Sequence, residues 1–268
     1  MPINTFDSYI LMHQGQIAAL QEASSYSLGH IMKIEKGQET FFKKNQISEP
    51  VFVSKSDDLL SGVTYRYLTS AMVMEQLHSV RNSNDFRHLS IIKLTQQSEG
   101  FDYIIQETLM DQYLLLSAAF IDYYLRYTLY FLTKEELIRF NVYDILNKLK
   151  ESNNLKANQA YEYLTDNVLF HKEKDYSNTN LDKEAFWGTR LKDLRNMTAH
   201  ERRIELALLP RTNSLGVTKI EPHLQNQSIA HFLQTKFDNN ILSMLTAMHP
   251  ILYGVEWGTG IYYEGMYD

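Results

Sequence analysis

The chain contains no cysteine among its 268 residues. This absence excludes a disulfide framework, a thiolate metal site and a cysteine nucleophile, and it suits a reducing cytoplasm. Proline and glycine are also sparse, with 5 and 11 residues. Because these residues punctuate turns, their scarcity favours long helices over a β fold with many turns.

The chain has no overall excess of positive charge, since its formal net charge is −6. A protein that coats duplex nucleic acid usually carries a broad basic surface, and this composition counts against that role. Residues 183–211 are the exception, with seven Lys or Arg against four Asp or Glu, a net charge of +3 that leaves −9 for the rest. Such a balance fits contacts to a few phosphates.

The N-terminus has no basic segment followed by an apolar run, so we do not expect a signal peptide. The apolar stretch 113–132 is as long as a membrane span, which takes about 20 residues. Asp122 and Arg126 lie within it, four residues apart, and we expect them to pair on one face of a helix in a water-soluble bundle. The sequence therefore predicts a cytoplasmic protein without membrane contact.

Apolar residues at helical spacing predict a mainly helical chain. Within the predicted helix that starts at Leu59 or Thr64, we expect Leu68, Met72 and Leu77 to face the core. The predicted helices cover residues 9–23, 59–80, 104–132, 133–150, 155–170, 186–204 and 228–248. Thr133 and Glu136 have the form of a capping box that would begin one of them, and Pro250 would end the last.

Two segments have the pattern of strands. Pro50–Val53 is a short strand candidate, and residues 206–220 contain turn formers that predict a β-hairpin. We divide the chain into an N-terminal extension of mixed structure (1–60), a helical bundle (61–250) and a Gly- and Tyr-rich tail (251–268). The extension would either pack on the bundle or help to bind a partner. The tail would either be mobile or dock its aromatic side chains on a partner chain.

Residues 186–204 carry the chemistry of interest on one predicted amphipathic helix. Its apolar stripe comprises Leu191, Leu194, Met197 and Ile204. Asp193, Asn196 and His200 lie on a neighbouring face, and Arg195 stands beside Asn196. An Arg binds phosphate through a planar fork of donors, and a His exchanges a proton near neutral pH. The pair is suited to cleavage of a phosphoester.

The segment Arg195-Asn196-Met197-Thr198-Ala199-His200 resembles the Arg-polar-x(3–5)-His signature of HEPN domains, which are small all-helical bundles. A long apolar helix with an embedded acid, Asp122, placed before the motif helix also resembles that architecture, so the likeness covers about residues 64–250. Arg81 and His88 fit the same pattern with a longer gap, but the turn formers between them predict a loop at a helix end.

The resemblance implies a metal-independent endoribonuclease that works as a homodimer and leaves 2′,3′-cyclic phosphate ends, in a toxin–antitoxin or phage-defence setting. Arg195 would hold the scissile phosphate, His200 would be the general acid or base, and Asn196 would occupy the polar position. Asp122 would support them, unless it merely pairs with Arg126. RNA and a neutralising or regulatory protein would be the partners, and no cofactor or metal is implied.

Two readings of this helix remain open. On an ideal α-helix Arg195 and His200 diverge by about 140°, so they converge only through side-chain reach or across a dimer. The catalytic hypothesis therefore predicts dimerisation. In the alternative, Arg195 caps or salt-bridges a bundle helix, His200 is partly buried, and the protein is a non-catalytic dimerisation or protein-interaction module. We treat His231 and His249 as structural, because neither has a metal-binding partner at a defined spacing.

Overall fold

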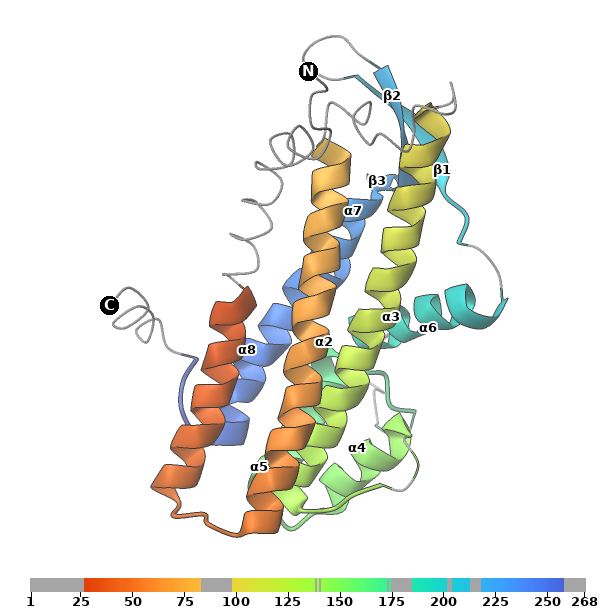
Figure 1. Cartoon of the computed structure of the whole chain (residues 1–268). Helices are drawn as coiled ribbons and strands as arrows, with labels where there is room; N and C mark the ends of the chain where they lie inside the picture. Colours follow the sequence, from red (N-terminus) through yellow and green to blue (C-terminus); the bar gives the residue numbers. More distant parts are fainter. Residues whose placement is uncertain are drawn as a thin grey trace, which may run out of the picture.

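Two long antiparallel helices, α2 (Pro50–Asn82) and α3 (Ser98–Thr133), run side by side through the centre of the molecule (Figure 1). The protein is represented by a computed structural model. It describes residues 27–82, 98–137, 139, 141–172, 174, 185–201, 204–212 and 218–257. The core is built around α3, which contributes Tyr113, Tyr124 and Tyr127 to the largest fully buried side chains.

The other helices surround this central pair. Helical residues 27–44 and helix α8 lie along one side, helices α4 and α5 lie at the lower end, and α6 crosses α3 (Figure 1). Their bounds are Val142–Glu151 for α4, Leu155–Asn167 for α5, Trp187–Asn196 for α6 and Asn239–Tyr253 for α8. Two π-helical turns interrupt regular helix: η4 (Met197–Glu201) after α6, and η5 (Gln234–Asp238) between the short α7 (Ile229–Leu233) and α8.

A small antiparallel sheet follows the motif helix. Strand β1 (Ala207–Thr212) pairs with β2 (Thr218–Leu224), with Ala207 opposite His223, and β2 pairs with the short β3 (Gln227–Ser228). Gln225 and Asn226 both have positive φ, as the tight hairpin turn between β2 and β3 requires. The predicted fold class, mainly α with a short β-hairpin after the motif helix, is confirmed.

The strand predicted at Pro50–Val53 is wrong, because these residues form the first turn of α2. Val53 N–H donates to Glu49 O at 3.0 Å, which makes Pro50 the first helical residue. Proline suits that position, where its missing N–H costs nothing and its fixed φ is already helical. The expected domain boundary at residue 60 falls within α2, and residues 9–23 lie outside the described part of the chain.

On α2, two of the three residues expected to face the core do so, and Met72 does not. Met74 and Leu77 are buried and Leu68 packs against the core, but Met72 is 43% exposed. The buried stripe runs through Leu60, Val63, Tyr67, Met74 and Leu77, at steps of three and four or their sum.

Thr133 ends a helix instead of beginning one. Its hydroxyl donates to Leu129 O in the last turn of α3, and Lys134 takes the left-handed conformation, with φ of 62°. A left-handed residue just past a helix is a common helix stop. Helix α4 begins at Val142, and the side chain of Asn141 caps it by accepting a hydrogen bond from Tyr143 N–H.

Pro250 does not end the last helix. It lies inside α8, which continues to Tyr253 and stops at Gly254, with φ of 68°. Proline obstructs the turn that precedes it and allows helix to follow, so one more turn forms before the left-handed glycine stops it.

Residues 27–44 pack against the bundle through aromatic and polar contacts. Tyr127 at the centre of α3 donates to Gln38 Oε1 at 2.8 Å and shares a 2.7 Å hydrogen bond with the hydroxyl of Tyr253. Gln38 in turn donates to Asp57 of α2 at 2.6 Å. Near these hydrogen bonds lies an aromatic cluster of Phe41, Phe42, Phe52, Phe131 and Tyr253. Residues 27–44 of the predicted N-terminal extension thus belong to the core.

Within the described residues, no helix has the combination of length and apolar character that crossing a membrane requires.

Candidate active site

The motif helix α6 is fixed at its start against the end of α5. Gly188 N–H donates to Val168 O at 2.9 Å, and Thr189 Oγ1 accepts from Phe170 N–H at 2.9 Å. A Cβ on Gly188 would lie 2.8 Å from Val168 Cγ1 and 2.9 Å from Val168 O, so only glycine permits this approach. The position of Arg195 therefore depends on a backbone contact made two turns earlier.

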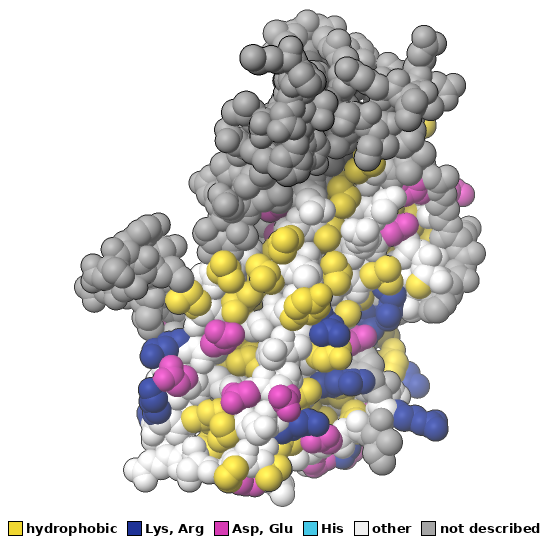
Figure 2. All heavy atoms as spheres, viewed as in Figure 1, with side chains coloured by type: hydrophobic (Ala, Val, Ile, Leu, Met, Phe, Trp, Pro, Cys, Tyr) yellow, Lys and Arg dark blue, Asp and Glu magenta, His cyan; other side chains and the backbone are white. Residues whose placement is uncertain are grey.

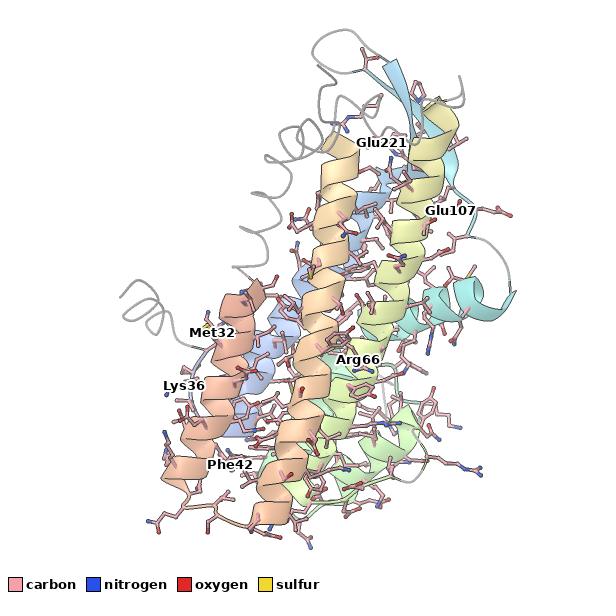
Figure 3. All side chains as sticks on the ribbon, in the orientation of Figure 1. Met32, Lys36, Phe42, Arg66, Glu107 and Glu221 are labelled. Atoms are coloured by element: carbon pink, nitrogen blue, oxygen red, sulfur yellow. The ribbon has the colours of Figure 1, made fainter. Side chains whose placement is uncertain are left out.

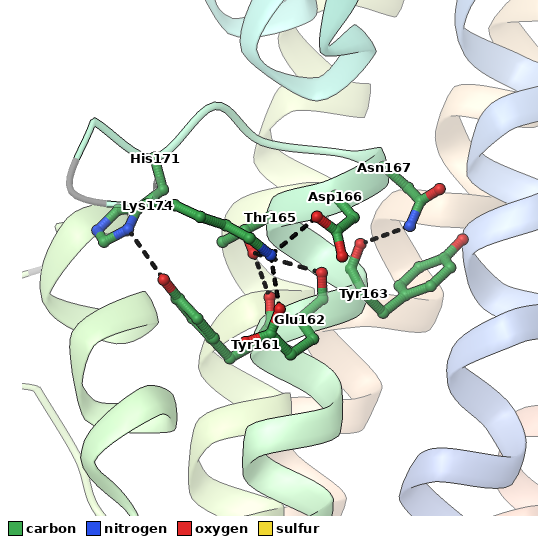
Figure 4. A network of polar contacts seen from close by, with 8 residues as sticks. All are labelled: Tyr161, Glu162, Tyr163, Thr165, Asp166, Asn167, His171 and Lys174. Atoms are coloured by element: carbon green, nitrogen blue, oxygen red, sulfur yellow. Dashed lines mark hydrogen bonds and ion pairs between the residues drawn. The ribbon is translucent and has the colours of Figure 1, made fainter. Parts of the chain in front are cut away.

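The segment after α5 is held by one lysine (Figure 4). Lys174 Nζ lies 2.6 Å from Glu162 Oε2, 2.8 Å from Asp166 Oδ1 and 2.9 Å from Thr165 Oγ1. Burial would lower the pKa of Lys174, but the two carboxylates outweigh burial and raise it. Beside it, the hydroxyl of Tyr161 lies 3.4 Å from Nδ1 of the buried His171. These contacts hold Lys174 and His171 against α5.

The apolar stripe predicted on the motif helix packs as expected. Leu191 is fully buried, Ile204 is 5% exposed, and Leu194 and Met197 are half-buried. Met197, however, already belongs to the π-helical turn η4, so the regular α-helix ends at Asn196 rather than at Ile204.

Asp122 of α3 pairs with the motif helix. Its carboxylate forms an ion pair with Lys192 of α6, and the two side chains are only 19% and 16% exposed. The sequence predicts a different partner, Arg126, four residues along α3. The guanidinium of Arg126 lies 5.8 Å from the ring centroid of Tyr123 instead. Lys192 reaches Asp122 because α6 packs across α3. A residue pattern along a single helix does not reveal such a contact between helices.

Lys192 brings a second positive charge beside Arg195. Burial lowers the pKa of Lys192, Asp122 opposes that effect, and the nearby charge of Arg195 lowers it further. The spacing of three residues between Lys192 and Arg195 places them on one helix face. That spacing was the signal in the sequence that would have identified Lys192.

Arg195 is half-buried, and its Nε is enclosed without a hydrogen-bond partner. In the described part of the chain its guanidinium makes no ion pair, so the predicted alternative of a structural salt bridge finds no partner there. Asn196 is exposed beside it, as are Asp193 and Ala199, three residues to either side. The motif helix therefore presents an open edge next to a cation that no described carboxylate neutralises.

His200 lies in the π-helical turn η4, and its side chain lies outside the described part of the structure. At the start of this turn Met197 N–H donates to both Asp193 O and Leu194 O, and the Thr198 hydroxyl donates to Arg195 O at 2.9 Å. The second copy of the motif begins at Arg81, one residue before α2 ends at Asn82, and His88 lies outside the described residues.

The π-helical turn changes the angle between the two motif residues. A turn closed by i→i+5 hydrogen bonds needs more residues for one rotation than an α-helix, so each residue turns through less than 100°. From Arg195 to His200 the backbone passes through this wider turn. Their positions around the axis consequently diverge by less than the about 140° of an ideal α-helix. Single π-helical turns inside α-helices occur frequently at functional sites.

No group of three or more His, Asp or Glu residues that could hold a metal ion is found in the described ranges. A scan against protein-family models, a search of curated proteins and a search of solved structures each find no match to this chain.

Proposed function

We propose that this chain is a metal-independent endoribonuclease of the HEPN type that acts as a homodimer. The observation that carries the proposal is the state of Arg195: half-buried beside Lys192, without a carboxylate partner in the described structure, five residues before His200 on a helix that widens between them. A cation placed in this way is available to a phosphate.

In the proposed reaction the 2′-oxygen of one nucleotide attacks the adjacent phosphorus while a base accepts its proton. The bond from phosphorus to the 5′-oxygen breaks, and that oxygen receives a proton. The products are a 2′,3′-cyclic phosphate and a 5′-hydroxyl. His200 transfers protons, and Arg195, with Lys192 behind it, offsets the negative charge that grows on the phosphoryl oxygens. Asn196 borders the site as an exposed hydrogen-bonding side chain.

The proposed dimer uses the exposed edge of Asp193, Asn196 and Ala199. In the proposed arrangement the two copies of this edge meet about a twofold axis, so Arg195 of one protomer works with His200 of its partner. The expected setting, a toxin or phage-defence effector with a neutralising or regulatory protein, derives from the resemblance of the motif alone.

The test is incubation of the purified chain with structured and unstructured RNA in EDTA, beside Arg195→Ala and His200→Ala. Arg190→Ala is the matched control, because Arg190 lies on the same helix with its guanidinium 5.5 Å from the ring centroid of Phe232. We expect the wild type and the control to leave cyclic phosphate ends, and each motif variant to lose about 10²-fold or more in rate. Absence of cleavage by the wild type, or cleavage that persists in both motif variants, would contradict the proposal.

Mixing the two inactive variants tests the proposed sharing of the site. If Arg195 and His200 act across the dimer, a mixed dimer contains one intact pair, and an equimolar mixture regains about a quarter of wild-type activity. If both residues act within one protomer, the mixture stays inactive. Light scattering of the same samples reports whether they are dimers.

A further inference from the structure

A second arginine is stacked on α3 beside the candidate site. The guanidinium carbon of Arg66 on α2 lies 3.5 Å from the ring centroid of Tyr123, and its Nη1 donates to Gly62 O at 3.0 Å (Figure 3). A Cβ on Gly62 would lie 2.6 Å from Tyr123 Cδ1, so glycine allows the ring to lie against α2. Arg66 is held flat and oriented, with further N–H donors that make no described hydrogen bond.

Arg66 is linked to the motif helix partly by side-chain contacts and partly along α3. Tyr123 lies next to Asp122 in α3, Asp122 pairs with Lys192, and the charge of Lys192 interacts with that of Arg195. Arg126, one turn after Asp122 on α3, also lies over Tyr123. We call this set the arginine strip: Arg66, Tyr123, Arg126, Asp122, Lys192 and Arg195.

The arginine strip has four cations and one carboxylate, which gives it a net positive charge on a chain whose net charge is −6. In Figure 2, Lys and Arg side chains lie mostly on the right and lower right of the face with Asp and Glu among them, and others lie at its left edge. Because the strip ends at Arg195, a polyanion lying along it would reach the motif helix.

We propose that the arginine strip binds the sugar–phosphate backbone of single-stranded RNA next to the cleaved bond, with Arg66 and Arg126 each contacting one phosphate. This deepens the proposed ribonuclease function and rests on it for the identity of the substrate. Stacking on Tyr123 orients the Arg66 guanidinium before RNA arrives, which reduces the entropy lost on binding. Contacts of this kind recognise phosphate and give no base preference.

The experiment measures binding separately from cleavage. A fluorescently labelled single-stranded RNA is titrated with the full chain carrying His200→Ala, and its anisotropy is followed from about 50 to 200 mM salt. Arg66→Gln and Arg126→Gln are compared with Arg139→Gln, a matched loss of one exposed arginine in the connection between α3 and α4. Arg66→Lys keeps the charge, and circular dichroism reports whether each variant is folded.

With about three phosphate contacts, made by Arg66, Arg126 and Arg195, the slope of log K against log salt should be about −2. We expect each of Arg66→Gln and Arg126→Gln to reduce the slope by about 0.7 and to weaken binding by roughly 5- to 10-fold at low salt. Arg139→Gln should change neither quantity, and Arg66→Lys should keep most of the slope.

Unchanged affinity and slope in folded Arg66→Gln and Arg126→Gln would overturn the arginine strip, even if the wild type cleaves RNA. An equal loss in Arg139→Gln would also overturn it, because the effect would then be one of overall charge. If the wild type does not cleave RNA but the two variants lose binding as expected, the strip is supported while the ribonuclease fails.

Discussion

Lys192 of α6 and Asp122 of α3 form an ion pair between two side chains that are less than one-fifth exposed. Asp122→Asn leaves the lysine charge in place without its carboxylate. Because an uncompensated charge at a largely buried site is costly, we expect the free energy of unfolding to fall by about 1–3 kcal/mol. Urea denaturation measures this change.

Lys192→Met removes the other partner and keeps an apolar stem of similar length. In the Asp122→Asn background this second substitution should recover most of the lost stability, since no buried charge remains. If Asp122→Asn is as stable as the wild type, the ion pair does not hold α6 on α3.

Asp238, at the end of η5, should make the protein less stable as pH rises. Burial raises the pKa of this carboxyl from 3.8 to about 6, and the nearby charge of Glu75 adds to the increase. The folded chain therefore binds more protons than the unfolded chain between these values, and stability falls as pH rises from about 4 to 6. Above pH 6 the full cost of ionisation remains.

Asp238→Asn should remove that cost. We expect the variant to be more stable than the wild type at pH 7, by at most about 3 kcal/mol, and to lose the advantage near pH 4. Denaturant unfolding at both pH values measures it, with Asp58→Asn, an exposed aspartate of α2, as the control. A pH-independent difference between variant and wild type would show that ionisation of Asp238 is not responsible.

His30 should make the protein less stable as pH falls, the opposite of the effect of Asp238. It is 5% exposed, its Nδ1 lies 2.7 Å from the Tyr67 hydroxyl, and burial, followed by the charge of Lys33, lowers its pKa from 6.5 to about 4. The unfolded chain then binds the extra proton between these values, so stability is lost as pH falls from about 6.5 to 4. In His30→Asn this part of the acid sensitivity should be absent. Equal slopes of stability against pH in variant and wild type would contradict the assignment.

Gly188→Ala should disturb the start of the motif helix. The added methyl group would meet the side chain and the backbone oxygen of Val168, and the oxygen cannot move away without shifting the end of α5. We expect a loss of about 1–3 kcal/mol in unfolding free energy, the range for overpacking, together with weaker RNA cleavage. Gly29→Ala is the control, because nothing lies within 4 Å of its added Cβ. At that helical position alanine should be neutral or stabilising, by up to about 1 kcal/mol.

Much of the fold could be predicted from the sequence because the helices alternate with clear turn formers. The helix at 104–132 lies within α3, the one at 155–170 contains α5, and the hairpin after the motif helix is present. The errors fall where two local signals compete. Val51 and Val53 favour a strand, but Pro50 fits the first position of a helix, and packing against residues 27–44 decides the outcome.

The candidate site was predictable in part. The apolar stripe and the exposure of Asn196 follow from helical spacing. The partner of Asp122 does not, because it depends on how α6 crosses α3, and neither does the stacking of Arg66 on a residue of another helix. The π-helical turn η4 has no signal in the sequence, since its residues also fit the α-helical period.

The contact between His249 and helical residues 27–44 determines when during synthesis the core can be completed. His249 Nε2 lies 3.3 Å from Lys33 O, a residue 216 positions earlier in the sequence. Synthesis at about 5–20 residues per second delays that meeting by roughly 10–40 s. During this interval the apolar face of residues 27–44 lacks its neighbours in α8. The core is complete only after α8 has emerged. The motif helix, which precedes α8 in the sequence, is synthesised before that point.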